Sequence, residues 1–263
     1  MALSIIVMGA AGRMGSTIAR LVEEADDLVL AAVLERPEAA DRLAGFKNSG
    51  VLVFSDVSVA LDHCPGAVVI DFTAPEATMV TARAAAEHGS PIIIGTTGFS
   101  EEQLAELDAL AARSLVFRSA NMSVGINVIM DILPRLTSLL GDAYDVEMME
   151  IHHNKKKDAP SGTALLLAEP LLEAKGLTRA DINTNRFDVR EPRKHAEIGI
   201  QSLRGGDVVG VHTVYYMGPG ERIEITHQAH SRENFANGAL RAARWIVSQQ
   251  PGHVYNMQDV LHD

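Results

Sequence analysis

Residues 150–163 bring many chemically active side chains together. They comprise two adjacent histidines, three consecutive lysines and a Ser-Gly-Thr turn: His152, His153, Lys155, Lys156, Lys157, Ser161, Gly162 and Thr163. An imidazole with a pKa near about 6.5 exchanges protons at neutral pH. Lysine ammonium groups attract anions. The stretch therefore predicts acid–base chemistry on a small anionic substrate.

The elements on either side would position these groups. Residues 144–151 have the pattern of a strand, and residues 163–175 that of a helix. Alone, the lysines are typical of a solvated turn, and Ser161 of a helix N-cap. Together, backbone N–H groups near Gly162 and Thr163 and a nearby lysine can hold a carboxylate. The loop is therefore predicted to bind a carboxylate substrate.

The histidine pair has a geometric condition and an alternative role. Neighbouring residues of a strand face opposite sides, so both imidazoles share one pocket only if the strand ends at about His152. Imidazole also binds metals, but no H-x-x-x-H, C-x-x-C or carboxylate triad completes a metal site. No metal is therefore predicted. Ordinary polar or packing roles are expected for the remaining scattered histidines, which include His195, His212, His227 and His230.

A glycine-rich stretch near the start suggests a nucleotide. Residues 4–8 are strand-like, residues 13–25 are helix-like, and Gly9, Ala10, Ala11, Gly12, Arg13, Met14 and Gly15 join them. Glycines let the backbone approach a pyrophosphate, which the helix N-terminus attracts. The spacing is G-x-x-G-x-x-G, which departs from the common G-x-G-x-x-G. Alone, this motif is weak evidence for nucleotide binding.

Two charged residues strengthen the nucleotide interpretation. Glu35 follows the strand-like residues 28–34 and lies twenty positions after Gly15, where an acidic side chain can bind ribose hydroxyls. Arg36 beside it can stack on adenine or meet a 2′-phosphate. The pair suggests use of both NADH and NADPH. The alternative is a plain surface charge pair.

Two further loops follow predicted strands, at 91–95 and 115–119. In open parallel sheets, ligands bind at the carboxyl ends of the strands. A nicotinamide-side pocket is therefore expected here, although each loop alone is also compatible with ordinary turn chemistry. The loop residues are Gly95, Thr96 and Thr97, and Ala120, Asn121 and Met122.

The order of elements predicts an α/β fold. Near-continuous apolar strands alternate with helical stretches up to about residue 120, which predicts a Rossmann-like, doubly wound parallel sheet. A helix is then predicted at 124–140, kinked or broken at Pro134. Strand-like residues 196–203, 208–216 and 222–230 predict a C-terminal α+β domain with an open, largely antiparallel sheet. A final helix is expected at 232–247.

Composition limits the classes of function. The 263 residues are 47% hydrophobic and carry a formal net charge of −11, which argues against binding to nucleic acid or an anionic membrane. No uninterrupted apolar run approaches the roughly 20 residues of a membrane span. The single cysteine, Cys64, permits no intrachain disulfide, as expected of a cytoplasmic protein.

With these motifs in place, the chain resembles the dihydrodipicolinate reductase family, the 4-hydroxy-tetrahydrodipicolinate reductases of the diaminopimelate route to lysine. The resemblance spans nearly the whole chain. Its most specific part is the run from Glu150 to Ala164, which matches glutamate–x–His–His–x–x–Lys–x–Asp–Ala–Pro–Ser–Gly–Thr–Ala. The other matching segments are residues 7–15, 95–99, 120–127 and 204–212, and the C-terminal helix.

The resemblance implies roles for individual residues. Gly9 to Met14 would cradle the pyrophosphate, Glu35 and Arg36 would take the adenosine ribose or its phosphate, and the loops at 95–97 and 120–122 would line the nicotinamide. His152 would be the general acid and Lys156 a second donor. The substrate carboxylates would be bound by the residues His153, Lys156, Ser161, Gly162 and Thr163.

The resemblance also implies an organisation and a mechanism. Residues 1–122 and 233–263 would form the dinucleotide-binding domain, and residues 123–232 the substrate-binding domain, which assembles a homotetramer. A hydride from NADH or NADPH would go to C4 of a cyclic dicarboxylate while His152 supplies a proton. The chain departs from the family at Met122, where phenylalanine is frequent, and at Lys155, where some members have histidine.

Two alternatives remain open. Another nicotinamide enzyme, such as an aspartate or homoserine dehydrogenase, would not need the loop at 150–163. A non-catalytic redox sensor would bind nucleotide but lack a full acid–base set. The residues do not decide between NADH and NADPH, or between the hydroxylated and dehydrated substrate, and they leave the extent of domain closure open.

Overall fold

The computed structural model describes residues 2–187 and 189–263. The chain divides into two compact units, which are described one at a time. Unit 1 comprises Met1–Ser123 and Arg232–Asp263, and unit 2 comprises Val124–Ser231. These boundaries lie one residue from the domain boundaries expected from the sequence.

Unit 1 is built on a parallel sheet with the strand order β12-β6-β5-β4-β1-β2-β3. The central strands are short aliphatic runs that are buried on both faces, which is why the sequence shows them as continuous apolar segments. The strands are β1 (Leu3–Met8), β2 (Leu28–Leu34), β3 (Leu52–Phe54), β4 (Val68–Asp71), β5 (Ile92–Ile94), β6 (Val116–Arg118) and β12 (Val254–Tyr255).

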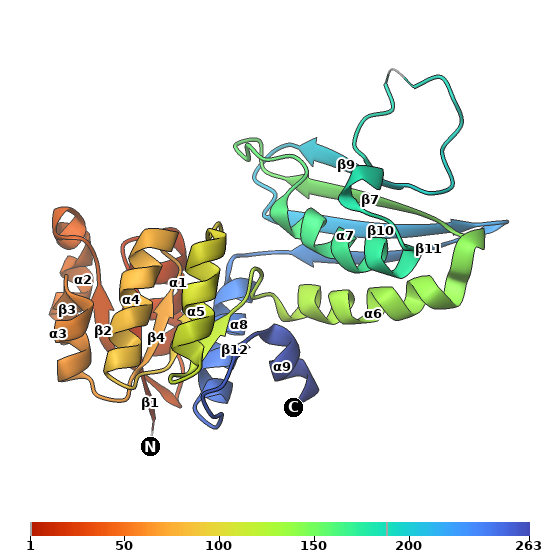
Figure 1. Cartoon of the computed structure of the whole chain (residues 1–263). Coiled ribbons are helices and arrows are strands. Elements are labelled where there is room, and N and C mark those ends of the chain that lie inside the picture. The colour runs from red at the N-terminus through yellow and green to blue at the C-terminus, as the bar shows by residue number, and fades with distance from the viewer. Residues whose placement is uncertain (1, 188) are drawn as a thin grey trace. The chain divides into compact units, whose positions relative to one another are not determined.

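Helices complete unit 1 (Figure 1). Helices α3, α4 and α5 pack beside one another, and α1 packs against α8. The core under the first group joins Leu61, Met79 and Leu107 to strand residues such as Val69. The Rossmann-like parallel sheet predicted from the sequence is confirmed. The helical elements are α1 (Arg13–Glu23), η1 (Pro37–Leu43), α2 (Ala44–Ser49), α3 (Val57–His63), α4 (Pro75–Glu87), α5 (Glu101–Ala111), α8 (Glu233–Ile246) and α9 (Met257–His262).

Helix caps show how local sequence sets the boundaries. Ser100 and Gln103 have the spacing of a capping box, and this box is present at the start of α5. At α3 the sequence offers Ser55 as a possible N-cap by its residue type, but Ser55 is not the cap. Asp56 takes that place, and its carboxylate accepts hydrogen bonds from the N–H groups of Ser58 and Val59. Serine and aspartate can both cap a helix, and the path of the chain into α3 favours Asp56.

Unit 2 has a mixed sheet with the order β11-β10-β7-β9-β8. Its pairs β10–β11 and β10–β7 are antiparallel, whereas β7–β9 and β8–β9 are parallel. Figure 1 shows α6 and α7 along one face of the sheet, and residues 184–187 and 189–197 of the connection between β8 and β9 projecting from it. The elements are α6 (Val124–Leu140), η2 (Gly141–Ala143), β7 (Asp145–His152), α7 (Gly162–Lys175), η3 (Arg179–Asp181), β8 (Ile182–Asn183), β9 (Ile198–Arg204), β10 (Gly210–Gly218) and β11 (Glu221–Ala229).

Helix α6 covers the residues predicted for it and continues through Pro134, so the helix is not broken there. It is held to the sheet by Thr137, whose hydroxyl lies 2.8 Å from the Tyr216 hydroxyl. Residues 124–143 are also long and apolar enough to cross a membrane, by length and composition alone. The sequence expectation missed this because it counted uninterrupted apolar runs, whereas an averaged hydropathy tolerates isolated charges such as Asp131 and Arg135.

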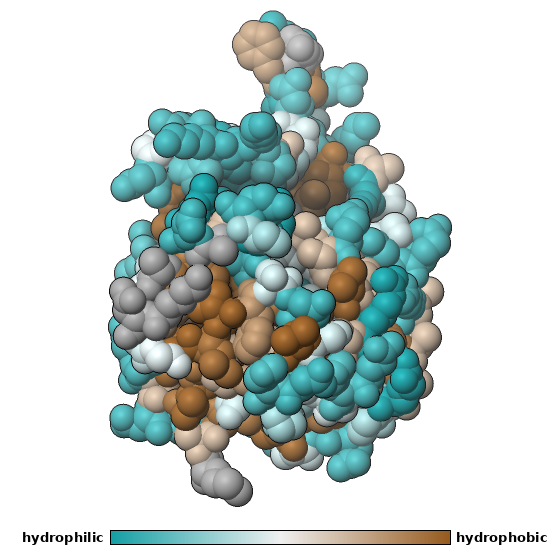
Figure 2. Space-filling model, turned by 90° about the vertical axis from the view of Figure 1, so that its left-hand side faces the viewer, coloured by the Kyte–Doolittle hydropathy of each residue, from teal (hydrophilic) through white to brown (hydrophobic). Residues whose placement is uncertain are grey.

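Figure 2 views the molecule from the side that is on the left in Figure 1, where β3 and α3 lie. Apolar side chains are visible there among polar ones. The large exposed apolar residues of these two elements include Leu52 and Val59. Scattered residues of this kind are ordinary on protein surfaces.

Candidate active site

The proton-transfer residues lie at the end of β7. The strand ends at His152, which is the condition for both histidines to reach one pocket. Alternate residues of β7 are buried, so Glu150 and His152 share the inner face of the strand. His153 follows in the turn, where its N–H donates to the Val208 carbonyl at 2.8 Å. The pattern of the strand therefore places a carboxylate beside the candidate acid.

Glu150 holds His152 in a defined orientation. Its Oε2 lies 2.6 Å from Nδ1 of His152. Arg204 at the end of β9 forms a bidentate pair with Glu150, at 2.8 and 2.7 Å. The backbone N–H of Ser161 also donates to this carboxylate, at 3.1 Å. Glu150 thus links β7, β9 and the start of α7.

The charges around Glu150 set its protonation. Burial acts to raise the pKa of Glu150, but hydrogen bonds from Arg204, Ser202 and His152 outweigh it and lower the pKa to about 2. An ionised Glu150 accepts the Nδ1 proton of His152, which assigns the free ring position to Nε2. A Cβ at Gly210 would lie 3.0 Å from that Nε2, so the glycine keeps space open beside it. His152 can therefore offer Nε2 to a ligand.

Burial lowers the pKa of His152, against the opposing effect of Glu150. The charges of Lys156 and Arg204 lower it further. The protein alone thus favours a neutral imidazole at neutral pH. A bound dianion would supply the missing negative charge and raise this pKa, which couples the acid to the presence of substrate.

His212 belongs to this cluster, contrary to the ordinary role expected from the sequence. Its ring centroid lies 5.1 Å from that of His152, with the planes at 73°. Its Nε2 lies 3.1 Å from the hydroxyl of Ser161. Local spacing in the sequence does not indicate this, because β10 brings His212 to the cluster through strand pairing, opposite Glu150.

The structure distinguishes the three lysines. Lys155 and Lys157 are exposed, whereas Lys156 is half-buried and pairs with Asp158 at 2.9 Å. The Lys156 charge also acts on the pKa of both His152 and His212. Of the three, Lys156 therefore fits the predicted role of second donor.

The start of α7 matches the predicted anion site. Ser161 is the N-cap, as expected, and its hydroxyl accepts from the N–H of Ala164 at 3.1 Å. Gly162 and Thr163 begin the helix. His153 and Lys156 thus lie in the loop that leads to this helix N-terminus, and the contact of all five predicted residues with substrate stays a prediction.

In unit 1, the glycine-rich loop has the backbone that its sequence predicts. Gly9 adopts φ +63°, and its carbonyl accepts from the N–H of Gly12 at 2.9 Å. A Cβ at Gly15 would overlap the Gly9 carbonyl, so this glycine permits close packing of α1 against the loop. The N-cap Gly12 contributes no side-chain cap to α1. Residues 9–14 therefore form a cradle that fits a pyrophosphate.

Glu35 and Arg36 take different positions beside this cradle. The Glu35 carboxylate accepts from the N–H of Ala11 at 3.1 Å and from that of Arg36 at 3.0 Å. The Arg36 side chain is 84% exposed, with its Nε 4.0 Å from Glu35. The structure therefore brings the acidic residue to the glycine loop and leaves the guanidinium at the surface.

The end of β4 is tied to the loop after β5 through Thr96 and through side chains without a predicted role, Asp71, Phe72 and Thr78. Thr78 and Thr96 are buried and their hydroxyls lie 2.9 Å apart. Thr78 donates to Asp71 at 3.1 Å. A Cβ at Gly95 would overlap the ring of Phe72. The predicted nicotinamide-side residues Gly95 and Thr96 are thus locked to the end of β4, while Thr97 is exposed.

The loop after β6 is also constrained. The Asn121 side-chain oxygen accepts from the N–H of Ser123 at 2.8 Å. A Cβ at Gly238 of α8 would overlap the Met122 carbonyl, so α8 packs closely on this loop. Met122 is buried and Ala120 is exposed. The loop has a fixed shape, and its contact with a cofactor stays a prediction.

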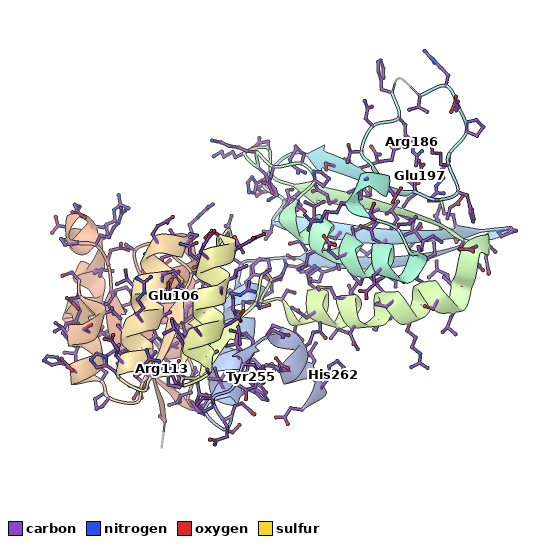
Figure 3. The ribbon with its side chains drawn as sticks, viewed as in Figure 1. Glu106, Arg113, Arg186, Glu197, Tyr255 and His262 are labelled. Atoms are coloured by element: carbon purple, nitrogen blue, oxygen red, sulfur yellow. The ribbon has the colours of Figure 1, made fainter. Side chains whose placement is uncertain are left out.

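A second charged cluster lies at the opposite end of β7. Arg186 and Glu197 face each other at 2.6 Å (Figure 3), and Arg193 pairs with Glu147 at 2.8 Å. A cavity of about 380 Å³ beside them is lined by Asp145, Glu147, Arg186, Val189, Glu191, Arg193 and Met217. This cavity lies away from His152, so its ion pairs are separate from the acid–base residues. No group of three or more His, Cys, Asp or Glu side chains suits a metal ion within residues 2–187 and 189–263.

Comparisons with known proteins agree with this geometry. Residues 3–122 match the family model "Dihydrodipicolinate reductase, N-terminus", and residues 125–261 match "Dihydrodipicolinate reductase, C-terminus". The chain is 59% identical to 4-hydroxy-tetrahydrodipicolinate reductase of Nitratidesulfovibrio vulgaris strain DP4, over 99% of this chain and 100% of the relative. It is 49% identical to the enzyme of Lawsonia intracellularis, with the same coverage.

Solved structures extend the comparison to the fold. The dipicolinate-bound dihydrodipicolinate reductase of Paenisporosarcina sp. TG-14 has a TM-score of 0.78 at 24% identity, covering 97% of this chain and 98% of that one. A probable dehydrogenase from Thermotoga maritima has a TM-score of 0.65 at 13% identity, covering 98% and 92%. The two family models and the relatives together show that the chain belongs to the dihydrodipicolinate reductase family, a family of nicotinamide-dependent oxidoreductases.

Proposed function

We propose that the protein reduces 4-hydroxy-tetrahydrodipicolinate, or the dihydrodipicolinate formed by its dehydration, to tetrahydrodipicolinate in the diaminopimelate route to lysine. The observation that carries this proposal is His152, oriented by Glu150 at 2.6 Å beside Lys156 and the start of α7. Such a cluster suits an anionic substrate that must receive a proton. Curated relatives with this activity support it.

The substrate carries two carboxylates, and the loop offers two kinds of partner. The Lys156 ammonium is positive and half-buried. The N-terminus of α7 adds the positive end of a helix dipole at Gly162 and Thr163. We assign these groups, with His153 and Ser161, to the substrate carboxylates. They would offset the charge of the dianion as the reaction proceeds.

His152 supplies the proton. When bound, the cofactor would supply a hydride to C4 of the cyclic imine. The electron pair displaced from the C4 double bond moves toward C3 and the ring nitrogen. Nε2 of His152 then transfers its proton to C3, and Glu150 stabilises the imidazolium before the transfer. The imidazole of His152 is neutral after this transfer, and it takes up a new proton from solvent.

The binding of substrate sets the timing of this step. Burial lowers the pKa of His152 in the protein alone. The dianion counteracts the charges of Lys156 and Arg204, so we expect the imidazolium to be populated chiefly in the complex. The imidazole of His152 therefore stays mostly neutral, without a proton on Nε2, until substrate binds.

We assign the nicotinamide cofactor to the loops of unit 1. Residues 9–14 would hold the pyrophosphate, Glu35 the ribose, and residues 95–97 and 120–122 the nicotinamide side. Arg36 at the surface would accommodate a 2′-phosphate, so we propose that NADH and NADPH are both used. A homotetramer in the cytoplasm, implied by the resemblance, completes the proposal.

The test follows the loss of NADH or NADPH absorbance, with substrate generated from pyruvate and aspartate semialdehyde by a coupling synthase. We expect oxidation that requires both this protein and the synthase product, with either cofactor. Cofactor binding without oxidation would refute the reductase and support the sensor alternative. The ratio of the two rates decides the cofactor preference.

A further inference from the structure

We propose that His212 is a positioning residue that makes the Ser161 hydroxyl a hydrogen-bond donor toward one carboxylate of the substrate. The inference rests on the proposed function, since it concerns how the same loop selects an anion. The general acid His152 has a different task, so the two histidines divide proton transfer and anion recognition between them.

Two groups surround the Ser161 oxygen. The N–H of Ala164 donates to it at 3.1 Å, which is the helix cap. Nε2 of His212 lies 3.1 Å away on another side. Ser161 is 1% exposed and His212 5% exposed, so the protein and not bulk water controls these contacts.

His212 is neutral at any working pH. Burial is the main cause that lowers its pKa to about 3, with a contribution from the nearby His152 and against the effect of Glu150. The other groups that act on it are His227 of β11, which is its strand partner, and Lys156 of the loop. A neutral imidazole has one N–H and one bare nitrogen.

The buried environment selects which nitrogen carries the proton. Nδ1 of His212 is buried without a hydrogen-bond partner in the part of the chain that the structure describes. A proton at Nδ1 would be a buried donor with no acceptor, and buried N–H groups without a partner are rarer in proteins than buried acceptors without one. The structure therefore favours a proton on Nε2, which donates to Ser161.

This assignment determines what Ser161 can bind. Its oxygen accepts from both Ala164 and His212, so its own proton is the group left for a ligand. A hydroxyl in this state recognises an acceptor such as a carboxylate oxygen. The N-terminus of α7 favours negative charge at the same place. Ser161 and the helix thus select one chemical class, a carboxylate.

The first test is the tautomer of His212. ¹⁵N-histidine NMR of the full-length protein at neutral pH should show His212 with Nε2 protonated and Nδ1 bare, assigned by loss of its signals in His212→Gln. A proton on Nδ1 would overturn the proposal. This readout requires no turnover, so it stands apart from success or failure of the proposed reaction.

The second test measures binding of pyridine-2,6-dicarboxylate by calorimetry in the presence of NADH. His212→Gln keeps an N–H near the position of Nε2 and should bind almost as wild type does. His212→Leu should bind about tenfold more weakly, the effect of one hydrogen bond to a charged group. Ser161→Ala should lose a similar factor, and the double variant should lose no more than either single one.

The proposal would be contradicted if the double variant lost dicarboxylate affinity by the product of the two single-variant factors. It would also be contradicted if His212→Leu bound the dicarboxylate as tightly as the wild type does. NADH affinity and the thermal midpoint monitor folding of each variant. A wild-type protein that binds the dicarboxylate but does not oxidise NADH with the synthase product would refute the proposed function and leave this inference intact.

Discussion

The loops of unit 1 and the loop 150–163 of unit 2 are both expected to hold anions, but they are built from different groups. In unit 1 the surface is made by backbone and hydroxyls, and the carboxylates of Asp71 and Glu35 accept from internal N–H and O–H groups. In unit 2 charged and titratable side chains contact one another directly, as Glu150 does with His152 and Arg204.

This difference corresponds to two chemical tasks. A cradle of backbone N–H groups binds phosphate by shape and dipole, and changes little with pH. A proton donor must change its charge during the reaction, so its neighbours have to tune its pKa. Substitutions in unit 1 should therefore alter cofactor affinity, whereas substitutions around His152 should alter turnover and its pH dependence.

The largest effect is expected at the acid itself. His152→Gln removes the proton donor and should lower kcat by about 10²- to 10⁴-fold, the usual contribution of general acid catalysis. Affinity for NADH should be unchanged, measured by fluorescence titration. His195→Gln is the matched control, because His195 is exposed in unit 2. Equal kcat in the two variants would exclude His152 from proton transfer.

A smaller effect is expected from Glu150→Gln. An uncharged partner no longer raises the pKa of His152, and its amide N–H can favour the wrong tautomer of the ring. We expect kcat to fall on the order of 10²-fold. Since the reactive form of His152 is protonated, kcat/KM should decline with rising pH around a lower midpoint than in the wild type. An unmoved midpoint would mean that Glu150 has only a structural role.

The two regions also differ in how far the sequence predicted them. The parallel sheet of unit 1 was predicted because its strands are continuous apolar runs between helical patterns. The elements that were missed, such as α2 and β12, are too short to show a periodicity. The capping box at Ser100 follows from the spacing of two residues in one helical turn, whereas the choice of Asp56 over Ser55 at α3 depends on the path of the chain.

The same distinction between local and distant partners applies to the site. His152, Lys156 and Ser161 lie within one short segment, so their joint role could be inferred from spacing. Arg204 reaches Glu150 across 54 positions, and His212 reaches Ser161 across 51. Strand pairing brings them there, and the register of β9 and β10 on β7 cannot be derived from composition or periodicity.

In unit 1 the corresponding substitution tests the shape of the glycine-rich loop. Gly15→Ala places a methyl group against the Gly9 carbonyl, and the loop must shift to accept it. We expect a loss of about 1–3 kcal/mol in the free energy of unfolding, as for other overpacked sites, and weaker NADH binding. At saturating NADH, kcat should stay near the wild-type value. Gly45→Ala is a matched control, since nothing lies within 4 Å of that Cβ.

The smallest effect is expected at Arg36, the exposed charge beside the cradle. Arg36→Ala should raise KM for NADPH about two- to fivefold, the range of an exposed ion pair, and leave KM for NADH unchanged. The difference should shrink as salt is added, because an exposed charge is screened. Arg42→Ala, also exposed, is the control. An equal rise for both cofactors would instead indicate stacking on adenine, a group that NADH and NADPH share.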